Sequence, residues 1–205
     1  MKKNIIIIWA WLHAEVITNI ISYDLNNNFI WYLDDNKKWY NILWKIKDFL
    51  NYIDNYYFIC AIWDNTSRDI IFNKIKSKWW KFINAIHPQS YIEKWVLIWE
   101  WVMVWANTYI NICSQIWDNT IINNWVIVEH HNIIWNSCHL SPWVISWWHI
   151  KIENNVFLWL NTLINDEIVI EKNVFSWSWT VINRNVEKNS IIIGVPYKII
   201  KKIWK

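Results

Sequence analysis

The sequence is nearly devoid of glycine. Among its 205 residues it has one glycine, Gly194, along with three prolines and three cysteines. Ordinary usage of about 7% would give about fourteen glycines in a chain of this length. A chain with so little glycine lacks the residue that most readily takes a positive φ in tight turns. Another residue is in corresponding excess, because 22 positions are tryptophan.

Ile, Asn and Lys are also abundant, as they are in proteins encoded by AT-rich genes. We therefore hypothesise that most or all of the tryptophans are glycines in the living protein, encoded by UGA codons that the host reads as glycine. The alternative is that the tryptophans are genuine and lie on the surface. That alternative would create a very large exposed apolar patch.

Other absences bound the class of protein. Cys60, Cys113 and Cys138 are far apart and form no C-x-x-C motif, which favours reduced thiols in a cytoplasmic protein. The apolar run Ile5–Ile8 is too short for the core of a signal peptide, and no stretch is long enough to span a bilayer. The net charge of +3 is scattered and gives no reason to expect nucleic acid. The basic end, "KIIKKIWK", favours a solvated helix or tail over a membrane-binding patch.

A repeat with a period of six residues runs through the second half of the chain. From Ile92 to Ile182, fourteen of the sixteen positions spaced by six are aliphatic, and the positions four residues later are mostly small or β-branched. One large and one small inward position per hexad predicts a left-handed parallel β-helix, in which three hexads form one triangular coil of 18 residues. Coils of this kind stack at a spacing of about 4.8 Å.

The tryptophans of the repeat avoid its predicted inward positions. Thirteen lie between Ile92 and Glu187, and twelve of them stand either one or three residues after the aliphatic position, where the coil turns its corners. Glycine relieves backbone strain at such corners. With glycine restored, a unit such as "IWDNTI" becomes an ordinary hexapeptide repeat.

Before the repeat, strand and helix patterns alternate. Strands are expected over 4–10, 27–35, 55–65 and 81–88, helices over 13–22 and 66–78, and a mixed segment over 40–53. This alternation predicts a small Rossmann-like parallel α/β sheet. We therefore divide the chain into a Rossmann-like α/β domain at 1–87, a β-helix at 88–187 and a C-terminal tail at 188–205. The first turn, G-A-G-L-H-A with glycines restored, is only a weak dinucleotide fingerprint.

Four of the six histidines lie in "VIVEHHNIIWNSCHLSPWVISWWHI". The register predicts that His130 and His131 point outward at a corner, that His149 stacks on His131 one coil later, and that His139 lies on another part of the triangle. Three interpretations remain open. His130 is a general base with its tautomer held by Glu129 or a nearby carboxylate; or His130, His131 and His139 of facing subunits hold zinc; or the histidines are solvated corners.

The order of motifs resembles a known family. "WAWLHAEV", "YLDD", "AIWDN" and "IHP" precede the hexads, and "IIIGVPYK" follows them. This order is similar to that of bacterial sugar acetyltransferases of the NeuD and PglD type, which modify sialic acids or UDP-4-amino sugars. The family carries glycine at the positions of Trp9, Trp11, Trp63, Trp135, Trp143 and Trp159.

The resemblance implies acetyl transfer from acetyl-CoA to an amino or hydroxyl group of a UDP-amino sugar or sialic-acid-type sugar. It implies a homotrimer with active sites between subunits, and no metal. His130 matches the general base, Glu129 precedes it as in the family, and His131 stands where a second carboxylate is common. His139 matches a histidine near the acetyl group.

The remaining site residues are also implied by the resemblance. The Trp148 N–H would stabilise the thioester oxyanion, and CoA would lie near Trp147, Trp148, Gly194 and Pro196. The sugar nucleotide would contact His13, Asp34, Asp35 and Asn65, although Leu12 replaces a usual glycine. Cys138 occupies an inward small position, which predicts core packing. A non-catalytic trimeric scaffold that binds sugar nucleotide or CoA is the alternative function, and a zinc hydratase is a third.

Overall fold

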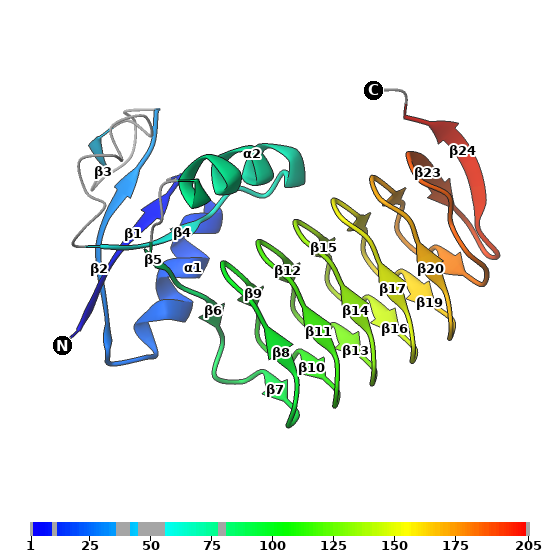
Figure 1. The fold of residues 1–205 in the computed structure, drawn as a ribbon, viewed down its shortest axis with the longest axis horizontal. Coiled ribbons are helices and arrows are strands. Elements are labelled where there is room, and N and C mark those ends of the chain that lie inside the picture. Colours follow the sequence, from blue (N-terminus) through cyan, green and yellow to red (C-terminus); the bar gives the residue numbers. More distant parts are fainter. Residues whose placement is uncertain (1, 10–11, 36–41, 45–55, 78–80, 204–205) are drawn as a thin grey trace. The chain divides into compact units, whose positions relative to one another are not determined.

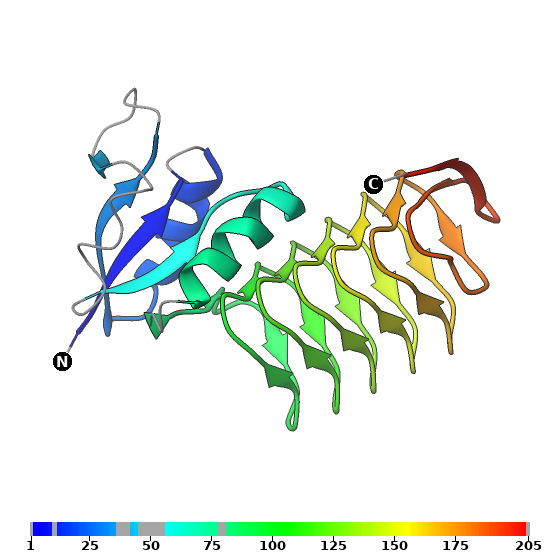
Figure 2. The same cartoon turned by 45° about the horizontal axis from the view of Figure 1, so that its top comes forward.

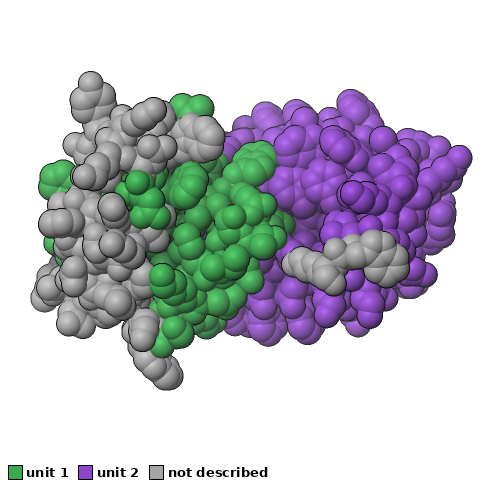
Figure 3. Space-filling view, turned by 90° about the horizontal axis from the view of Figure 1, so that it is seen from above, with its two compact units in different colours: residues 1–87 green, residues 88–205 purple. Residues whose placement is uncertain are grey.

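The computed structural model describes residues 2–9, 12–35, 42–44, 56–77 and 81–203. It divides into two compact units, residues 1–87 and 88–205, which Figure 3 shows in separate colours. In the described part of the chain, no helix has the length and apolar character needed to cross a bilayer.

In its described residues, the first unit consists of a parallel sheet and two helices (Figure 1). Its sheet has the order β3-β2-β1-β4-β5, and every neighbouring pair is parallel. The elements are β1 (Lys3–Ile8), α1 (Leu12–Ser22), β2 (Asn27–Leu33), β3 (Ile42–Trp44), β4 (Tyr57–Cys60), α2 (Asn65–Lys76), β5 (Lys81–Phe82) and a short strand β6 (Ala85–Ile86). The predicted α/β alternation is confirmed. The rest of the mixed segment at 40–53 lies outside the described residues.

Burial explains the central strand. Ile5, Ile6, Ile7 and Ile8 are fully buried, because a strand in the middle of a parallel sheet has both faces covered. Helix α2 begins where Asp64 accepts a hydrogen bond from the Ser67 N–H at 2.8 Å, an N-cap that satisfies one of the free amides of the first turn.

The second unit is the predicted left-handed parallel β-helix, seen as a stack of triangular coils in Figures 1 and 2. One face contains β7 (Tyr91–Ile92), β10 (Tyr109–Ile110), β13 (Ile127–Val128), β16 (Ile145–Ser146), β19 (Leu163–Ile164) and β22 (Val181–Ile182). The next face contains β8 (Leu97–Ile98), β11 (Gln115–Ile116), β14 (Ile133–Ile134), β17 (Lys151–Ile152) and β20 (Val169–Ile170). The third contains β9 (Met103–Val104), β12 (Ile121–Ile122), β15 (His139–Leu140), β18 (Phe157–Leu158), β21 (Phe175–Ser176), β23 (Ser190–Ile193) and β24 (Lys198–Lys202).

The 18-residue coil is exact in the strand register. Tyr109 pairs with Tyr91 and with Ile127, and the same offset recurs around the prism. The aliphatic position of most hexads is fully buried, and the small position joins the same core, which includes Val126, Cys138 and Val144. Cys138 is therefore core packing, as predicted, and its thiol donates to the Glu153 carbonyl at 3.0 Å.

The corners three residues after the repeat positions from Ile92 to Ser176 are left-handed. The fifteen corner residues from Trp95 to Trp179 all have φ between 55° and 64°. Asparagine occupies five of them and tolerates this conformation, but tryptophan occupies another five, where an indole-bearing residue costs about 1–2 kcal/mol. The tryptophan corners are Trp95, Trp101, Trp125, Trp143 and Trp179.

Four of these five indoles are exposed, and several tryptophans of the prism stack on the equivalent tryptophan one coil later. Trp99 and Trp117 stack at 4.4 Å between ring centroids, and Trp125 and Trp143 stack at 4.9 Å. Trp101 departs from the expectation of exposed corner indoles because it is fully buried, although it is not part of the prism core. Within the described residues, the buried Trp117 Nε1–H finds no acceptor, an arrangement that disfavours a genuine indole.

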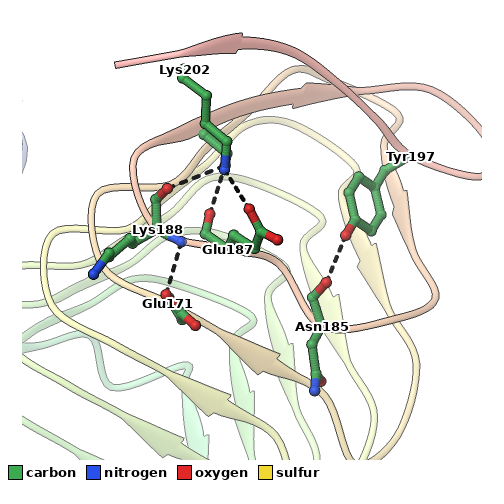
Figure 4. A network of polar contacts seen from close by, with 7 residues as sticks. Glu171, Asn185, Glu187, Lys188, Tyr197 and Lys202 are labelled. Carbon is green, nitrogen blue, oxygen red and sulfur yellow. Dashed lines mark hydrogen bonds and ion pairs between the residues drawn. The ribbon is translucent and has the colours of Figure 1, made fainter. Parts of the chain in front are cut away.

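The basic C-terminal segment is a strand, which corrects the expectation of a helix or tail. β24 pairs antiparallel with β23, whose other neighbour β21 belongs to the last coils. Figure 4 shows the polar contacts that hold it: Lys202 Nζ donates to Glu187 Oε2 at 2.8 Å and to Ser190 Oγ at 3.0 Å. The Lys202 ammonium lowers the pKa of Glu187 through this hydrogen bond and through its charge.

Candidate functional site

The first unit gathers polar residues at one edge of its sheet. β1, β2 and β4 are parallel neighbours, so their carboxyl ends lie along the same edge. His13 follows β1, Asp34 follows β2, and Asn65 follows β4. β1 is also where the strand order reverses direction, and open α/β sheets bind ligands outside the carboxyl ends at such a point.

The turn after β1 takes the conformation expected of glycine. Trp9 has a φ of 79° and donates its N–H to the Leu33 carbonyl at 2.7 Å. This is a left-handed position that a side chain rarely adopts. Trp11, the other predicted glycine of this turn, lies outside the described residues. The second carboxylate of the pair, Asp35, is exposed, whereas Asp34 is buried.

A buried arginine organises the turn after β4, and the sequence reasoning missed it. Arg68 is fully buried and donates to the carbonyls of Ile62 and Trp63 at 3.2 and 3.0 Å and to Asn65 Oδ1 at 2.9 Å. The guanidinium thus fixes the Asn65 amide and places a permanent positive charge beneath the strand ends. The signal for it in the sequence was a charged residue on the buried face of a predicted helix.

The same charge acts on His13. Burial, followed by the charge of Arg68, lowers the pKa of His13 to about 4, so its imidazole is neutral at physiological pH. The ring also meets the Trp63 indole edge to face at 6.1 Å. A neutral imidazole beside a buried guanidinium can exchange hydrogen bonds with an uncharged or anionic ligand without adding a second positive charge.

The second unit presents three of its four histidines at one corner, as predicted. His130 and His131 form the corner after β13, and the His149 N–H donates to the His130 carbonyl one coil later at 3.3 Å. The His131 and His149 rings stack at 5.1 Å between centroids, which confirms the predicted pair. The His130 ring lies edge to face with both of them.

The contact between His130 and His131 determines which nitrogen can act as a base. Their Nδ1 atoms lie 3.0 Å apart, so one of the two must carry the proton. When His130 carries it, His131 accepts, and the Nε2 lone pair of His130 is free to take a proton. His131 therefore provides the orienting contact for which a carboxylate was expected.

Glu129 does not fill that place. Its Oε2 accepts a hydrogen bond from Asn111 Nδ2 at 2.7 Å, one coil away along the same corner. Glu129 directly precedes His130 in the sequence. This hydrogen bond fixes its carboxylate, so its negative charge stays at the corner.

Trp148 lies one coil above His130. The two rings are parallel within 5°, with centroids 5.7 Å apart, and the Trp147 indole packs on Trp148 at 4.7 Å. The Trp148 carbonyl accepts from the Glu167 N–H at 3.0 Å, whereas among the described residues the Trp148 N–H donates to no acceptor. A free amide beside a candidate base is what an oxyanion site requires.

His139 lies on another face of the prism. It stands on β15, is fully buried, and its Nε2 lies 3.4 Å from Asn123 Nδ2 with the Phe157 ring at 4.7 Å. As predicted from the register, one chain does not bring His130 and His139 to the same corner. The imidazoles that it does bring together are those of His130, His131 and His149.

The C-terminal turn contains the single glycine. Gly194 has a φ of 102°, and its carbonyl accepts from the Val181 N–H at 3.0 Å. Tyr197 follows Pro196 and is held by Arg184, whose guanidinium lies 4.2 Å from its ring centroid, and by a hydrogen bond from its hydroxyl to the Asn185 carbonyl at 2.6 Å (Figure 4).

Comparisons with known proteins agree with this architecture. Residues 4–75 match the family model described as the PglD N-terminal domain. No curated protein sequence matches the chain.

Solved structures match over nearly the whole length. PerB from Caulobacter crescentus, in complex with CoA and GDP-perosamine, is 23% identical with a TM-score of 0.89, and the match covers 97% of each chain. The acetyltransferase domain of PglB from Neisseria gonorrhoeae FA1090, in complex with acetyl coenzyme A, is 17% identical with a TM-score of 0.91, covering 98% of this chain and 100% of that one. The two matches show that the chain has their fold.

Proposed function

We propose that the protein is an acetyl-CoA-dependent acetyltransferase that acts on an amino or hydroxyl group of a nucleotide-linked sugar. The observation that carries the proposal is the β-helix corner where His130, oriented by His131, lies beside the free N–H of Trp148. Similar folds that hold acetyl coenzyme A, or CoA with GDP-perosamine, support the substrate classes.

In the proposed reaction the sugar amine or hydroxyl attacks the carbonyl carbon of the thioester. A new C–N or C–O bond forms and the C–S bond breaks. Nε2 of His130 takes the proton of the attacking group and delivers it to the departing sulfur, so CoA leaves as a thiol. The Trp148 N–H stabilises the negative oxygen of the tetrahedral intermediate.

The sugar nucleotide would occupy the sheet edge of the first unit. His13, Asp34 and Asn65 follow three neighbouring strands there, with Arg68 supplying positive charge for a diphosphate. Asp35, which is exposed beside Asp34, would contact the sugar nucleotide as well.

The CoA arm would run along the β-helix near Trp147 and Trp148 toward Gly194 and Pro196. We also propose a homotrimer, because one chain does not bring His130 and His139 to the same corner. The free thiols of Cys60, Cys113 and Cys138 support a cytoplasmic location.

The indole of Trp148 is the main evidence for the alternative function, a non-catalytic scaffold. In the chain with tryptophan at position 148, the indole covers one face of the His130 imidazole. With glycine at this position the ring face is open to substrate, and with tryptophan it is covered. A chain with genuine tryptophans here would suit the non-catalytic scaffold better.

The test is release of CoA thiol in the presence of acetyl-CoA and UDP-4-amino sugars, GDP-linked amino sugars or sialic acid. Two versions of the chain are assayed, one with tryptophan and one with glycine at all 22 tryptophan positions of the sequence. We expect turnover by the glycine version and at least a 100-fold loss on His130→Gln, the size of a missing general base. Full activity of His130→Gln would overturn the assignment, and acetyl-CoA binding without turnover on any acceptor would favour the scaffold.

A further inference from the structure

Three imidazoles converge at one corner of the β-helix. His130 and His131 are adjacent, and His149 belongs to the following coil. One ring nitrogen from each lies within 4.8 Å of the other two. His130 is half-buried, whereas His131 and His149 are exposed, so an ion could reach them from solvent.

The backbone holds this cluster in place. His131 and His149 have φ values of 59° and 55°, and each is tied by its N–H to the coil before it. The two α-carbons therefore stack at the coil spacing of about 4.8 Å. The side chains can turn about χ1 and χ2, but their origins are fixed by the same hydrogen bonds that build the prism.

The distances suit a tetrahedral metal ion. Zinc–imidazole bonds of about 2.0–2.1 Å place neighbouring ligand nitrogens about 3.3 Å apart. The Nδ1 atoms of His130 and His131 are already 3.0 Å apart, and His149 needs only a side-chain rotation to join them. Three neutral imidazoles with an open fourth position form a common zinc-binding set.

Charges around the cluster favour a cation. Glu129 precedes it, and Asp166 and Glu167 occupy the next turn of the same corner, where Glu167 follows His149 by 18 residues. Lys151, two residues after His149, is the nearest basic residue in sequence. The acidic groups outnumber it, so the corner attracts divalent cations more than it repels them.

We propose that His130, His131 and His149 of one chain form a binding site for Zn²⁺. Binding of the ion at Nδ1 of His130 requires the ring proton to lie on Nε2, which then has no lone pair to accept a proton from substrate. Zinc binding therefore inhibits acetyl transfer; this second statement rests on the proposed function. The metal has no part in the transfer itself, which needs only a base and an oxyanion donor. The site differs from the zinc set considered from sequence, in which His139 of a facing subunit took the place of His149.

Binding is measured with Zn²⁺ alone, by competition with a chromophoric chelator, on the full-length metal-free chain. We expect one ion per chain. His149→Asn and His131→Asn should each weaken binding by roughly 100-fold or more, because a three-imidazole site then retains two ligands. Asparagine is chosen because it tolerates the left-handed backbone of both positions.

The control is His87→Asn, which removes a histidine of the first unit and should leave the zinc affinity within about twofold. Equal affinity in the native chain and all three variants would show adventitious binding and overturn the proposal. The proposal would also be overturned if the chain, at the highest concentration tested, removed no zinc from the chelator.

Inhibition is tested separately, in the glycine version of the chain. Zn²⁺ should abolish turnover of the native site, while His149→Asn should keep its turnover and lose the sensitivity. Suppose that zinc binding is lost in His149→Asn but zinc does not affect turnover in the native site. The metal site would then be confirmed, and the proposal that zinc blocks His130 would be overturned. If no acceptor is turned over, the proposed function fails, and the binding measurement still decides the metal site.

Discussion

The imidazole of His130 and the indole of Trp148 lie parallel within 5° at 5.7 Å, on successive coils of one corner. An offset of 18 residues therefore brings the candidate base against a residue whose backbone N–H is free. The Trp148 indole covers the His130 imidazole, whereas the Trp148 backbone N–H is suited to stabilise an oxyanion. Glycine at this position would keep the amide and remove the cover.

The native protein should contain glycine where the sequence prints tryptophan. We expect its mass to fall below that of the printed chain by one tryptophan-to-glycine difference per site, and peptides spanning Trp125 and Trp143 to carry glycine. Mass spectrometry of protein from the native host, with the codons at the 22 positions, checks this. Tryptophan in those peptides would show that the corners are genuinely bulky.

Glycine at a left-handed corner should stabilise the β-helix. Trp179 has a φ of 62° and is 69% exposed, so its indole contributes little packing to offset the strain. We expect Trp179→Gly to be more stable than Trp179→Ala by about 1 kcal/mol, because alanine keeps the Cβ that causes the strain. In a chain of this size that is a rise in Tm of about 2–4 °C, measured by calorimetry.

The matched comparison uses a corner with an ordinary backbone. Trp147 is 43% exposed and is not among the residues with positive φ. There the same pair of substitutions should reverse order, with glycine less stable than alanine because of its greater chain entropy. Stabilisation by glycine at both sites would show that left-handed strain is not the cause.

Stability should fall in acid because of His13. The folded chain holds the pKa of His13 at about 4, below the ordinary value of 6.5, through burial and Arg68. Between these two values the unfolded chain binds the proton and the folded chain does not, so stability decreases as the pH falls from about 6.5 to about 4. Each pKa unit is worth about 1.4 kcal/mol, so the full effect reaches about 3 kcal/mol.

Denaturant titrations at pH 7, 6, 5 and 4 measure this loss. His13→Asn should show a shallower decrease than the native chain, since it removes the group that titrates. Parallel curves for the two proteins would mean that other groups account for the acid sensitivity.

Replacing the orienting histidine should move the pH profile of the proposed reaction. His131→Asp places a carboxylate next to Nδ1 of His130, and a negative charge there favours the imidazolium form of the base. We expect the rising limb of kcat/KM to move to higher pH in this variant. His131→Asn, which brings no charge, should leave the limb where it is.

A shift of the limb in both variants would assign the effect to lost packing, and no shift in either would mean that His131 does not orient the base. Aspartate and asparagine both tolerate the left-handed backbone at this corner, so the pair differs mainly in charge.

The sequence alone predicted the β-helix, its register and the stacking of His131 on His149. It could do so because a solenoid relates residues by a fixed offset: once Ile92 and Ile110 are known to share a face, every other contact between coils follows. The same register predicted that Cys138 is core and that His139 lies away from His130.

Non-repeating contacts were decided by the tertiary structure. The burial of Arg68, the approach of His130 to the other two imidazoles, the burial of Trp101 and the pairing of β24 with β23 all depend on side-chain packing that no period encodes. A lysine-rich segment such as Lys198–Lys202 has no strong preference of its own, and it becomes a strand because β23 offers a free edge. The period of the sequence determines which residues lie in equivalent positions of successive coils. The stabilisation of a single buried charge or of an edge strand depends on neighbours that are distant in the chain.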